Sequence, residues 1–397
     1  MQLLDRLGLS VSLPDLARRV LAALPNEDRA GWRFDAAECT LTNGTGSNVN
    51  LVNMFTEYRN AARGQRGDLV RKYAQIVTAG SREIPALWPA AVRQVYPVLR
   101  SAFVDTWPEI ASRGSGEPYS RLAIPFAGDL EVRLMYDFGS FMTYVKPEHL
   151  ATWGQGQEDV LAHAMANLGR LEAASWRADP RGFHEIESPE SLGESMLLLN
   201  SVVSALPYAS DAVFMPCNRG RLLACDGRNE AGWAAMLTEA TRCARVEPWP
   251  MSGLAFRLGA GGWELAAPPA SAAIQASNLW RVHQADIYAT QAEALGKHYE
   301  SQQIDIFVAA YSLMDFRDKP SQSYCVWSMD VDSLLPVADS VVLVSSDEDD
   351  HFLRVAWQDV MAICGPHLVE TAESPARFRV TTFPSDGEMA ALQRVAL

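Results

Sequence analysis

The chain has 397 residues, of which 48% are hydrophobic and 21% are charged, and this apolar content excludes a chain that is disordered throughout. Its 34 Lys and Arg residues stand against 48 Asp and Glu residues, so that the formal net charge is -14. Since no cluster of Lys or Arg offers a basic face, we expect neither nucleic acid nor an anionic membrane as a partner. An acidic surface favours basic proteins or cations, although it also promotes solubility.

The sequence predicts a cytoplasmic protein with reduced thiols. Asp5 and Arg6 interrupt the apolar stretch at the N-terminus, which therefore lacks the apolar core of a signal peptide. We find no run of about 18 apolar residues, the length that a membrane span needs. The 6 cysteines are sparse and none stands in a Cys-x-x-Cys pair, as is usual for free thiols in a reducing compartment.

The first part of the chain predicts helices and short strands. The expected elements are a helix from Ser12 to Leu24, a strand from Trp32 to Leu41, helices over 51–58 and 69–77, and a strand over 95–100. The last strand contains Pro97, which places it at a sheet edge or at a strand end. Residues 130–136 alternate between apolar and polar, and a turn at 137–140 leads to a return strand over 141–145. This pattern predicts a hairpin with one buried face.

The second part predicts further hairpins and helices. The expected elements are helices over 157–171, 195–205, 229–243 and 278–300, hairpins over 211–225 and 254–265, and strands over 304–313 and 323–327. The segment Pro268-Pro269-Ala270-Ser271 is the best candidate for a linker. The strand over 304–313 is apolar on both faces, as is typical of a central strand.

Two segments resemble each other at a spacing of about 130 residues. Ala166–Arg170 is echoed by Glu293–Lys297, and Ser204–Ala209 is echoed by Ser333–Ala338. We therefore expect an α+β fold of mostly antiparallel sheets flanked by helices, with an internally duplicated helix-hairpin-helix-hairpin module. The expected divisions are an N-terminal helical segment (1–27), a larger α+β domain (28–268), and a smaller α+β module (275–397) that repeats the pattern of about 157–257. Chance similarity between two apolar helix–strand patterns is the alternative.

The acidic run Asp347-Glu348-Asp349-Asp350 is the most concentrated charge in the sequence. In the register of the repeat it forms a hairpin tip, followed by a return strand over 351–355 and a helix from Trp357. We predict that this solvated tip takes part in binding a protein partner. A Mg²⁺ or Ca²⁺ site is the alternative, but the run lacks the alternating acids and the distal Glu of a calcium loop.

No catalytic or metal-binding motif stands out. Cys364-Gly365-Pro366-His367 lacks the second thiol of a redox motif, and the 7 histidines have no metal-ligand spacing. The segment around Ser195 lacks the final Gly of a nucleophile elbow, and the Gly-rich turn at 259–262 leads into a strand. The carboxylates of Asp137, Glu148 and Asp226 are candidates for an acid/base pair, but nothing in the sequence selects them among the 48 acids. The sequence therefore predicts no cofactor and no metal.

The region from Val95 to Gly227 resembles the YtpQ-like family of uncharacterised bacterial proteins (domain of unknown function 1444). The resemblance rests on the following segments: Tyr96–Arg100, the hairpin Asp129–Tyr144, Leu150–Trp153, Ala166-Asn167-Leu168 and Val213–Pro216. These are packing motifs, and the region that they span is about a third of the chain. The resemblance implies no catalytic residues, because the family has no known function.

The leading hypothesis is a non-catalytic soluble binding protein, such as an adaptor, a chaperone-like factor or an immunity-type factor, whose acidic surface engages a basic protein. The alternative is a hydrolase whose active site is assembled from residues distant in the sequence. A concave pocket with convergent ionisable groups would favour the enzyme. An exposed apolar patch rimmed by acids would favour the binding protein. The sequence leaves the oligomeric state open.

Overall fold

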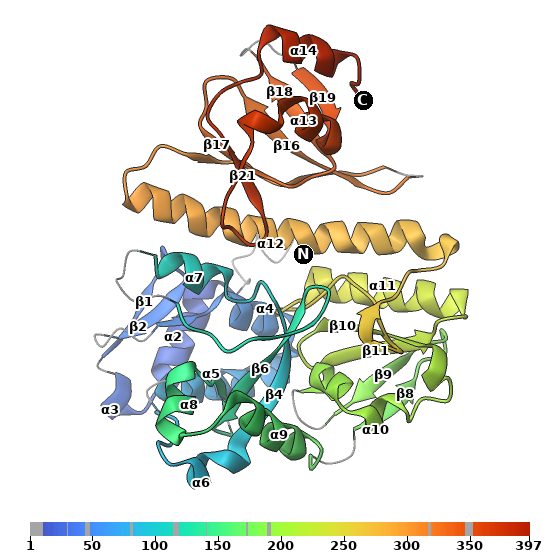
Figure 1. Cartoon of the computed structure of the whole chain (residues 1–397). Coiled ribbons are helices and arrows are strands. Elements are labelled where there is room, and N and C mark those ends of the chain that lie inside the picture. Colours follow the sequence, from blue (N-terminus) through green and yellow to red (C-terminus); the bar gives the residue numbers. More distant parts are fainter. Residues whose placement is uncertain are drawn as a thin grey trace.

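The computed structural model describes residues 11–29, 31–43, 48–79, 82–113, 119–139, 141–171, 174–188, 192–316, 319–345 and 352–397. Figure 1 shows three lobes arranged around one long helix, α12 (Ala273–Ser301). The N-terminal lobe (residues 11–171) and the middle lobe (residues 174–268) lie side by side on one side of α12. The C-terminal lobe (residues 304–397) lies on the opposite side of this helix.

The first part of the N-terminal lobe is a three-stranded antiparallel sheet that shares one apolar cluster with three helices. Its elements are α2 (Leu13–Ala23), α3 (Asn26–Arg29), β1 (Trp32–Asp35), β2 (Thr40–Asn43), β3 (Asn48–Asn50), α4 (Val52–Asn60) and α5 (Arg66–Ala79). Ser12 caps α2 through reciprocal hydrogen bonds with Asp15, which confirms the predicted helix start. The single strand predicted from Trp32 to Leu41 is wrong. The chain turns between β1 and β2, where Cys39 has a φ of 53°, and the two strands pair as a hairpin.

The second part of the N-terminal lobe is a four-stranded antiparallel sheet. Its elements are α6 (Trp88–Ala91), β4 (Val95–Ser101), α7 (Thr106–Ala111), β5 (Ile124–Ala127), β6 (Leu130–Asp137), β7 (Met142–Tyr144), α8 (Pro147–Trp153) and α9 (Gln157–Leu168). Among the described strands β4 pairs with β6 alone, as expected for an edge strand, and β6 pairs with β7 in the predicted hairpin. The prediction of one buried face is wrong, because Glu131 and Arg133 are buried as well and form an ion pair.

The middle lobe is a six-stranded antiparallel sheet with the order β13-β12-β10-β11-β9-β8. Its elements are β8 (Ser175–Ala178), β9 (His184–Glu187), α10 (Asn200–Val203), β10 (Ala212–Asn218), β11 (Arg221–Asp226), α11 (Glu230–Val246), β12 (Phe256–Gly259) and β13 (Gly262–Leu265). Both predicted hairpins and the helix predicted over 229–243 are confirmed. The helix predicted over 195–205 is wrong in extent, because a 3₁₀ turn over Gly193–Leu198 precedes the four-residue α10.

The C-terminal lobe contains two four-stranded sheets, with the orders β14-β17-β21-β20 and β15-β16-β18-β19. Its elements are β14 (Phe307–Val308), β15 (Ser312–Met314), β16 (Gln322–Ser328), β17 (Ser333–Pro336), β18 (Ser340–Val344), β19 (Phe352–Ala356), α13 (Trp357–Cys364), β20 (Val369–Glu370), β21 (Arg377–Val380) and α14 (Asp386–Gln393). The predicted return strand and the helix from Trp357 are confirmed as β19 and α13. The single strand predicted over 304–313 is wrong, because β14 and β15 belong to different sheets.

The predicted duplication is not confirmed, because the strand pairing of the two segments differs. In the register of the repeat β18 corresponds to β10, which pairs with β11 and with β12 in the antiparallel sense. In the C-terminal lobe β18 pairs with β19 in the antiparallel sense but with β16 in the parallel sense. Ser333–Pro336 forms a strand, whereas its predicted counterpart at 204–209 lies outside the described strands. Similar local patterns of apolar residues are therefore used in different tertiary pairings.

The fold is α+β with mostly antiparallel sheets flanked by helices, as predicted. The described strands include two parallel pairs, β14 with β17 and β16 with β18. The domain boundaries at residues 27, 268 and 275 stay predictions. None of the described helices combines the length and the apolar character that a membrane crossing requires.

The thiols give a first testable prediction. All 6 cysteines are free, and Cys39 is partly exposed while the other five are buried. Burial raises the pKa of Cys225 and of Cys325 to about 12. In the native protein at about pH 8 we therefore expect a thiol reagent to modify Cys39 quickly and the buried thiols only on unfolding. Titration in denaturant should then count six thiols, and a smaller number in freshly purified protein would contradict the predicted reducing compartment.

Candidate functional site

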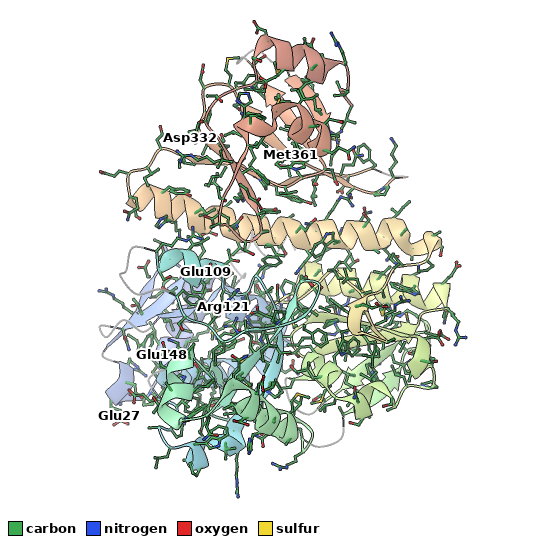
Figure 2. The ribbon with its side chains drawn as sticks, viewed as in Figure 1. Glu27, Glu109, Arg121, Glu148, Asp332 and Met361 are labelled. Atoms are coloured by element: carbon green, nitrogen blue, oxygen red, sulfur yellow. The ribbon has the colours of Figure 1, made fainter. Side chains whose placement is uncertain are left out.

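The residues that the sequence singled out do not form a site within the described structure. The acidic run Asp347-Glu348-Asp349-Asp350 lies outside the described residues. Asp137 accepts a hydrogen bond from the backbone N–H of Gly139, and Asp226 accepts one from that of Arg228. Both carboxylates thus hold local turns, and Glu148 lies on α8, where Figure 2 labels it. No contact joins Asp137, Glu148 and Asp226 within the described parts of the chain.

Ser195 is buried and holds the middle lobe to β4. Its Oγ accepts a hydrogen bond from the backbone N–H of Leu99 (3.0 Å) and donates one to Oε1 of Glu194 (3.2 Å). Gly193 has no room for a Cβ, which would overlap the carbonyl of Gly220. Gly193 and Ser195 therefore serve close packing. Cys364 is also buried, and desolvation raises the pKa of its thiol to about 11, which disfavours a redox role.

A cavity of about 540 Å³ lies where α12 meets the two lobes beneath it. Its walls come from α4, the end of β4, the turn between β10 and β11, residues 249–251 and α12. These segments are far apart in the sequence. The cavity contains convergent ionisable side chains, namely Arg100, Arg219, His283, Asp286 and Glu293. Cavities of this size, with a few fixed polar groups, are typical of sites for small molecules.

The wall formed by β4 and the β10–β11 turn is built on a buried ion pair. Nη1 of Arg100 lies 2.7 Å from Oε1 of Glu194, and the two side chains are 6% and 0% exposed. Glu194 also accepts a hydrogen bond from the backbone N–H of Gly220 (2.5 Å). A buried carboxylate with this many donors is well satisfied. In contrast, Nε of Arg100 is buried without a hydrogen-bond partner among the described residues.

Arg219 lies at the tip of the β10–β11 hairpin and stacks on Trp249, with 5.5 Å between its guanidinium carbon and the ring centroid. Burial, together with the nearby positive charge of Arg100, lowers the pKa of Arg219 to about 10. The backbone N–H of Arg219 donates to the carbonyl of Trp249 (3.2 Å), and that of Met251 donates to the carbonyl of Cys217 (3.2 Å). Trp249 has a φ of 61°, which is unfavourable for a tryptophan. These bonds hold the indole ring in place beneath the arginine.

His283 of α12 lies at the same cavity. Its Nε2 is 3.3 Å from Oδ2 of Asp129, and Ser252 donates a hydrogen bond to the other oxygen of Asp129 (2.6 Å). Nε2 of His283 and Oδ2 of Asp129 make no hydrogen bond within the described ranges. No sequence motif joins Arg100, Arg219, Trp249 and His283. They stand far apart along the chain, so the sequence does not reveal that they line one cavity.

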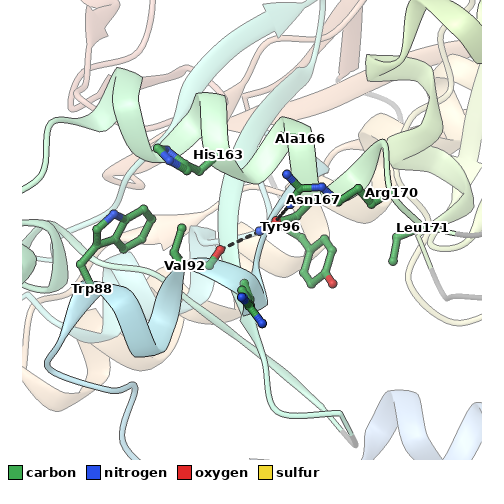
Figure 3. Close-up of a pocket in the computed structure, with 9 residues that line it drawn as sticks. Trp88, Val92, Tyr96, His163, Ala166, Asn167, Arg170 and Leu171 are labelled. Carbon is green, nitrogen blue, oxygen red and sulfur yellow. Dashed lines mark hydrogen bonds between the residues drawn. The ribbon is translucent and has the colours of Figure 1, made fainter.

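Figure 3 shows another cavity, of about 700 Å³, between α6 and α9. Nδ2 of Asn167 donates to the carbonyl oxygens of Val92 (2.7 Å) and Val95 (2.8 Å), and Oδ1 of Asn167 accepts from Arg170 (3.2 Å). These bonds hold α9 against the start of β4. The polar groups at the centre of this cavity are thus already engaged in the fold, and we assign no site to it.

The C-terminal lobe carries an exposed apolar surface that is interleaved with acids. This acid-rimmed patch consists of Ile304, Phe307, Met329, Val331, Asp305, Asp330 and Asp332. Its two segments are joined by the backbone N–H of Phe307, which donates to the carbonyl of Asp332 (2.8 Å). Phe307 is 57% exposed, and Figure 2 shows Asp332 on the side of the lobe. Asp332 pairs with Arg379 (2.6 Å), whereas Asp305 and Asp330 form no ion pair with the described residues.

No group of three or more His, Cys, Asp or Glu side chains suited to a metal ion is found among the described residues. No family model matches the sequence, and neither a curated protein nor a solved structure matches it. Membership of the YtpQ-like family therefore stays a prediction.

Proposed function

We propose that this chain is a non-catalytic soluble protein of the cytoplasm that binds a basic protein, as an adaptor, a chaperone-like factor or an immunity-type factor. The observation that carries the proposal is the acid-rimmed patch of the C-terminal lobe. Contiguous apolar surface with a polar rim marks interaction sites, whereas single exposed apolar side chains are ordinary. The patch combines four exposed apolar side chains with three aspartates in two adjoining segments.

The chemistry of the patch indicates how such a partner would be recognised. An aromatic side chain such as Phe307 supplies a large contact area at the centre of an interface. Asp305 and Asp330 form no ion pair with the described residues, and the whole chain has a net charge of -14. Opposite charges increase the rate of association and select against acidic partners. A partner with Lys or Arg around an apolar surface matches both features.

The hydrolase alternative has two observations in its favour, the cavity beneath α12 with its ionisable side chains and the buried pair of Asp129 and His283 beside it. A carboxylate next to an imidazole is part of many arrangements that activate a nucleophile. We prefer the binding protein because the acid-rimmed patch contains both an apolar centre and an acidic rim, which are the two features that such binding uses.

The second prediction tests the patch by affinity capture. The double variant Phe307→Ser, Val331→Ser should retain its fold, because both side chains are exposed. Leu258→Ser is the matched control, since Leu258 is 45% exposed in the middle lobe. Capture from native lysate, followed by mass spectrometry, should recover a basic protein with the wild type and the control. The patch variant should bind that protein at least about tenfold more weakly.

The kinetics of this complex separate charge from apolar contact. The association rate should fall with added salt, and more so for the wild type than for a chain with Ser or Asn at positions 347–350. The dissociation rate should respond mainly to Phe307→Ser. Equal affinity of the wild type and the patch variant for the captured protein would refute the patch as its binding surface. If the association rate does not depend on salt, the acidic charge does not steer the partner and serves solubility alone.

A further inference from the structure

The cavity beneath α12 has two arginines on one wall, and among the described residues only one of them has an ion-pair partner. Arg100 and Arg219 lie on one wall, close enough for the charge of Arg100 to disfavour the protonated form of Arg219. Glu194 forms an ion pair with Arg100. Within the described residues, Arg219 has no carboxylate at ion-pair distance and makes no side-chain hydrogen bond, so the face of Trp249 is its partner. The described structure thus supplies an ion-pair partner to Arg100 but none to Arg219.

Holding the two guanidinium groups near each other costs free energy. Like charges in a partly desolvated site repel each other more strongly than in water. Nε of Arg100 and Nδ2 of Asn218 are buried donors without a partner in the described structure, and such donors are rare in native proteins. The backbone bonds between the hairpin tip and residues 249–251 fix the positions of Arg219 and Trp249. The arrangement is therefore set before any ligand arrives.

We propose that this cavity binds a small molecule through an oxyanion, which is either a phosphate or a carboxylate group. The guanidinium of Arg219, beside that of Arg100, would hold this group. Guanidinium groups bind such oxyanions with paired, charge-assisted hydrogen bonds. The anion would offset the repulsion between the two arginines and supply the counter-charge that Arg219 lacks. This site is separate from the acid-rimmed patch and does not depend on the proposed protein partner.

The remaining walls define the rest of the ligand. Phe103, Met251 and Ile287 supply apolar surface, and Trp249, which carries Arg219 over its ring, also lines the cavity. Asp286 and Glu293 lie on the α12 wall, so negative charge is favoured only at the arginine side of the cavity. A volume of about 540 Å³ exceeds that of a free phosphate ion. The ligand is thus a molecule with one anionic end and a less polar body.

The third prediction tests the arginine side with simple anions. The thermal unfolding of the full chain is measured against inorganic phosphate and, in a separate series, against acetate, with chloride holding the ionic strength constant. Both anions alter the stability of most proteins through solvent effects. The informative quantity is therefore the difference in stabilisation between the wild type and Arg219→Met. Saturable stabilisation should appear in the wild type, and its midpoint concentration should rise at least about tenfold in Arg219→Met.

Two further variants complete the test. Arg93→Met makes the same change at an exposed arginine of the other cavity, and it should bind the anion like the wild type. Arg219→Lys keeps the charge but loses the planar fork, so it should bind with intermediate affinity. A response to phosphate assigns a phosphoryl group to the ligand, and a response to acetate alone assigns a carboxylate. Equal responses of the wild type, Arg219→Met and Arg219→Lys to both anions would overturn the proposal, and Arg219 would then be a structural side chain that stacks on Trp249.

Discussion

Replacing Arg377 with Met is expected to lower the free energy of unfolding of the C-terminal lobe by about 3 to 5 kcal/mol. Arg377 is fully buried. Its Nε donates to Oε1 of Gln291 (2.6 Å), and its Nη1 donates to the carbonyls of Ala309 (2.9 Å) and Leu334 (3.1 Å). The guanidinium also lies over the ring of Tyr288, 5.2 Å from its centroid. One side chain thus joins α12, β17 and the segment after β14.

The cost arises because methionine fills the space but donates no hydrogen bond. The carbonyl of Ala309 and Oε1 of Gln291 would remain buried without the donor that Arg377 supplies, at about 1 to 3 kcal/mol for each group. The carbonyl of Leu334 would still accept a hydrogen bond from the backbone N–H of Ala309 (3.0 Å). Arg379→Met is the matched control on the same strand. Arg379 is exposed and pairs with Asp332 at the surface, so its loss should change stability by at most about 1 kcal/mol. Denaturant unfolding, with hydrogen exchange of β17 and β21, measures both variants. A loss in Arg377→Met no larger than that in the control would contradict this account.

Replacing Arg133 with Met is expected to destabilise the N-terminal lobe by about 3 to 5 kcal/mol. Nη1 of Arg133 lies 2.5 Å from Oδ2 of Asp105 and 2.7 Å from Oε1 of Glu131. All three side chains are less than 9% exposed, and Arg133 also lies over the ring of Tyr144 (4.6 Å). Removing the cation leaves two carboxylates buried beside each other. Uncompensated buried charge is among the most costly consequences of a single substitution.

A triple variant separates charge from packing in this network. Arg133→Met combined with Asp105→Asn and Glu131→Gln keeps the approximate shape of the side chains and removes all three charges. It should recover most of the stability that Arg133→Met loses, because neutral amides are far less costly to bury than carboxylates. The measurement is the denaturant midpoint of each variant under identical conditions. If the triple variant is as unstable as the single one, the loss comes from the stacking on Tyr144 and not from charge.

The buried network at Arg133 also shows where sequence reasoning failed. Alternation of Leu130, Val132 and Leu134 with Glu131 and Arg133 predicted a strand with one solvated face. The strand is present, but its polar residues face Asp105 at the start of α7 and are buried. Alternation of apolar and polar residues indicates the two faces of a strand, and a charged residue usually lies on the face toward solvent. A buried ion pair breaks this rule, and its partner is not visible in the local pattern.

The candidate cavity was beyond sequence reasoning for the same reason. Arg100, Arg219, Trp249 and His283 come from four separate segments, and none has a neighbour in the sequence that reveals its role. Ser195, whose surroundings in the sequence lack the final Gly of a nucleophile elbow, is a buried side chain that accepts a hydrogen bond from the backbone N–H of Leu99. The acid-rimmed patch was partly foreseeable, because Asp305, Asp330 and Asp332 alternate with apolar residues. Their exposure, however, depends on how β14 lies beside β17.

The sequence by itself determined the local elements: the capped start of α2, the hairpins β10–β11 and β12–β13, the strand β19 and the helix that follows it. Helix caps, alternating apolar and polar residues, and turn residues act between neighbours a few positions apart. They can therefore be recognised in the sequence without knowledge of the fold. Only the tertiary structure decided which strands pair across the chain, which charges are buried, and which arginines meet beneath α12. These outcomes depend on contacts between residues far apart in the sequence, whose free energy is gained only when the lobes close on one another.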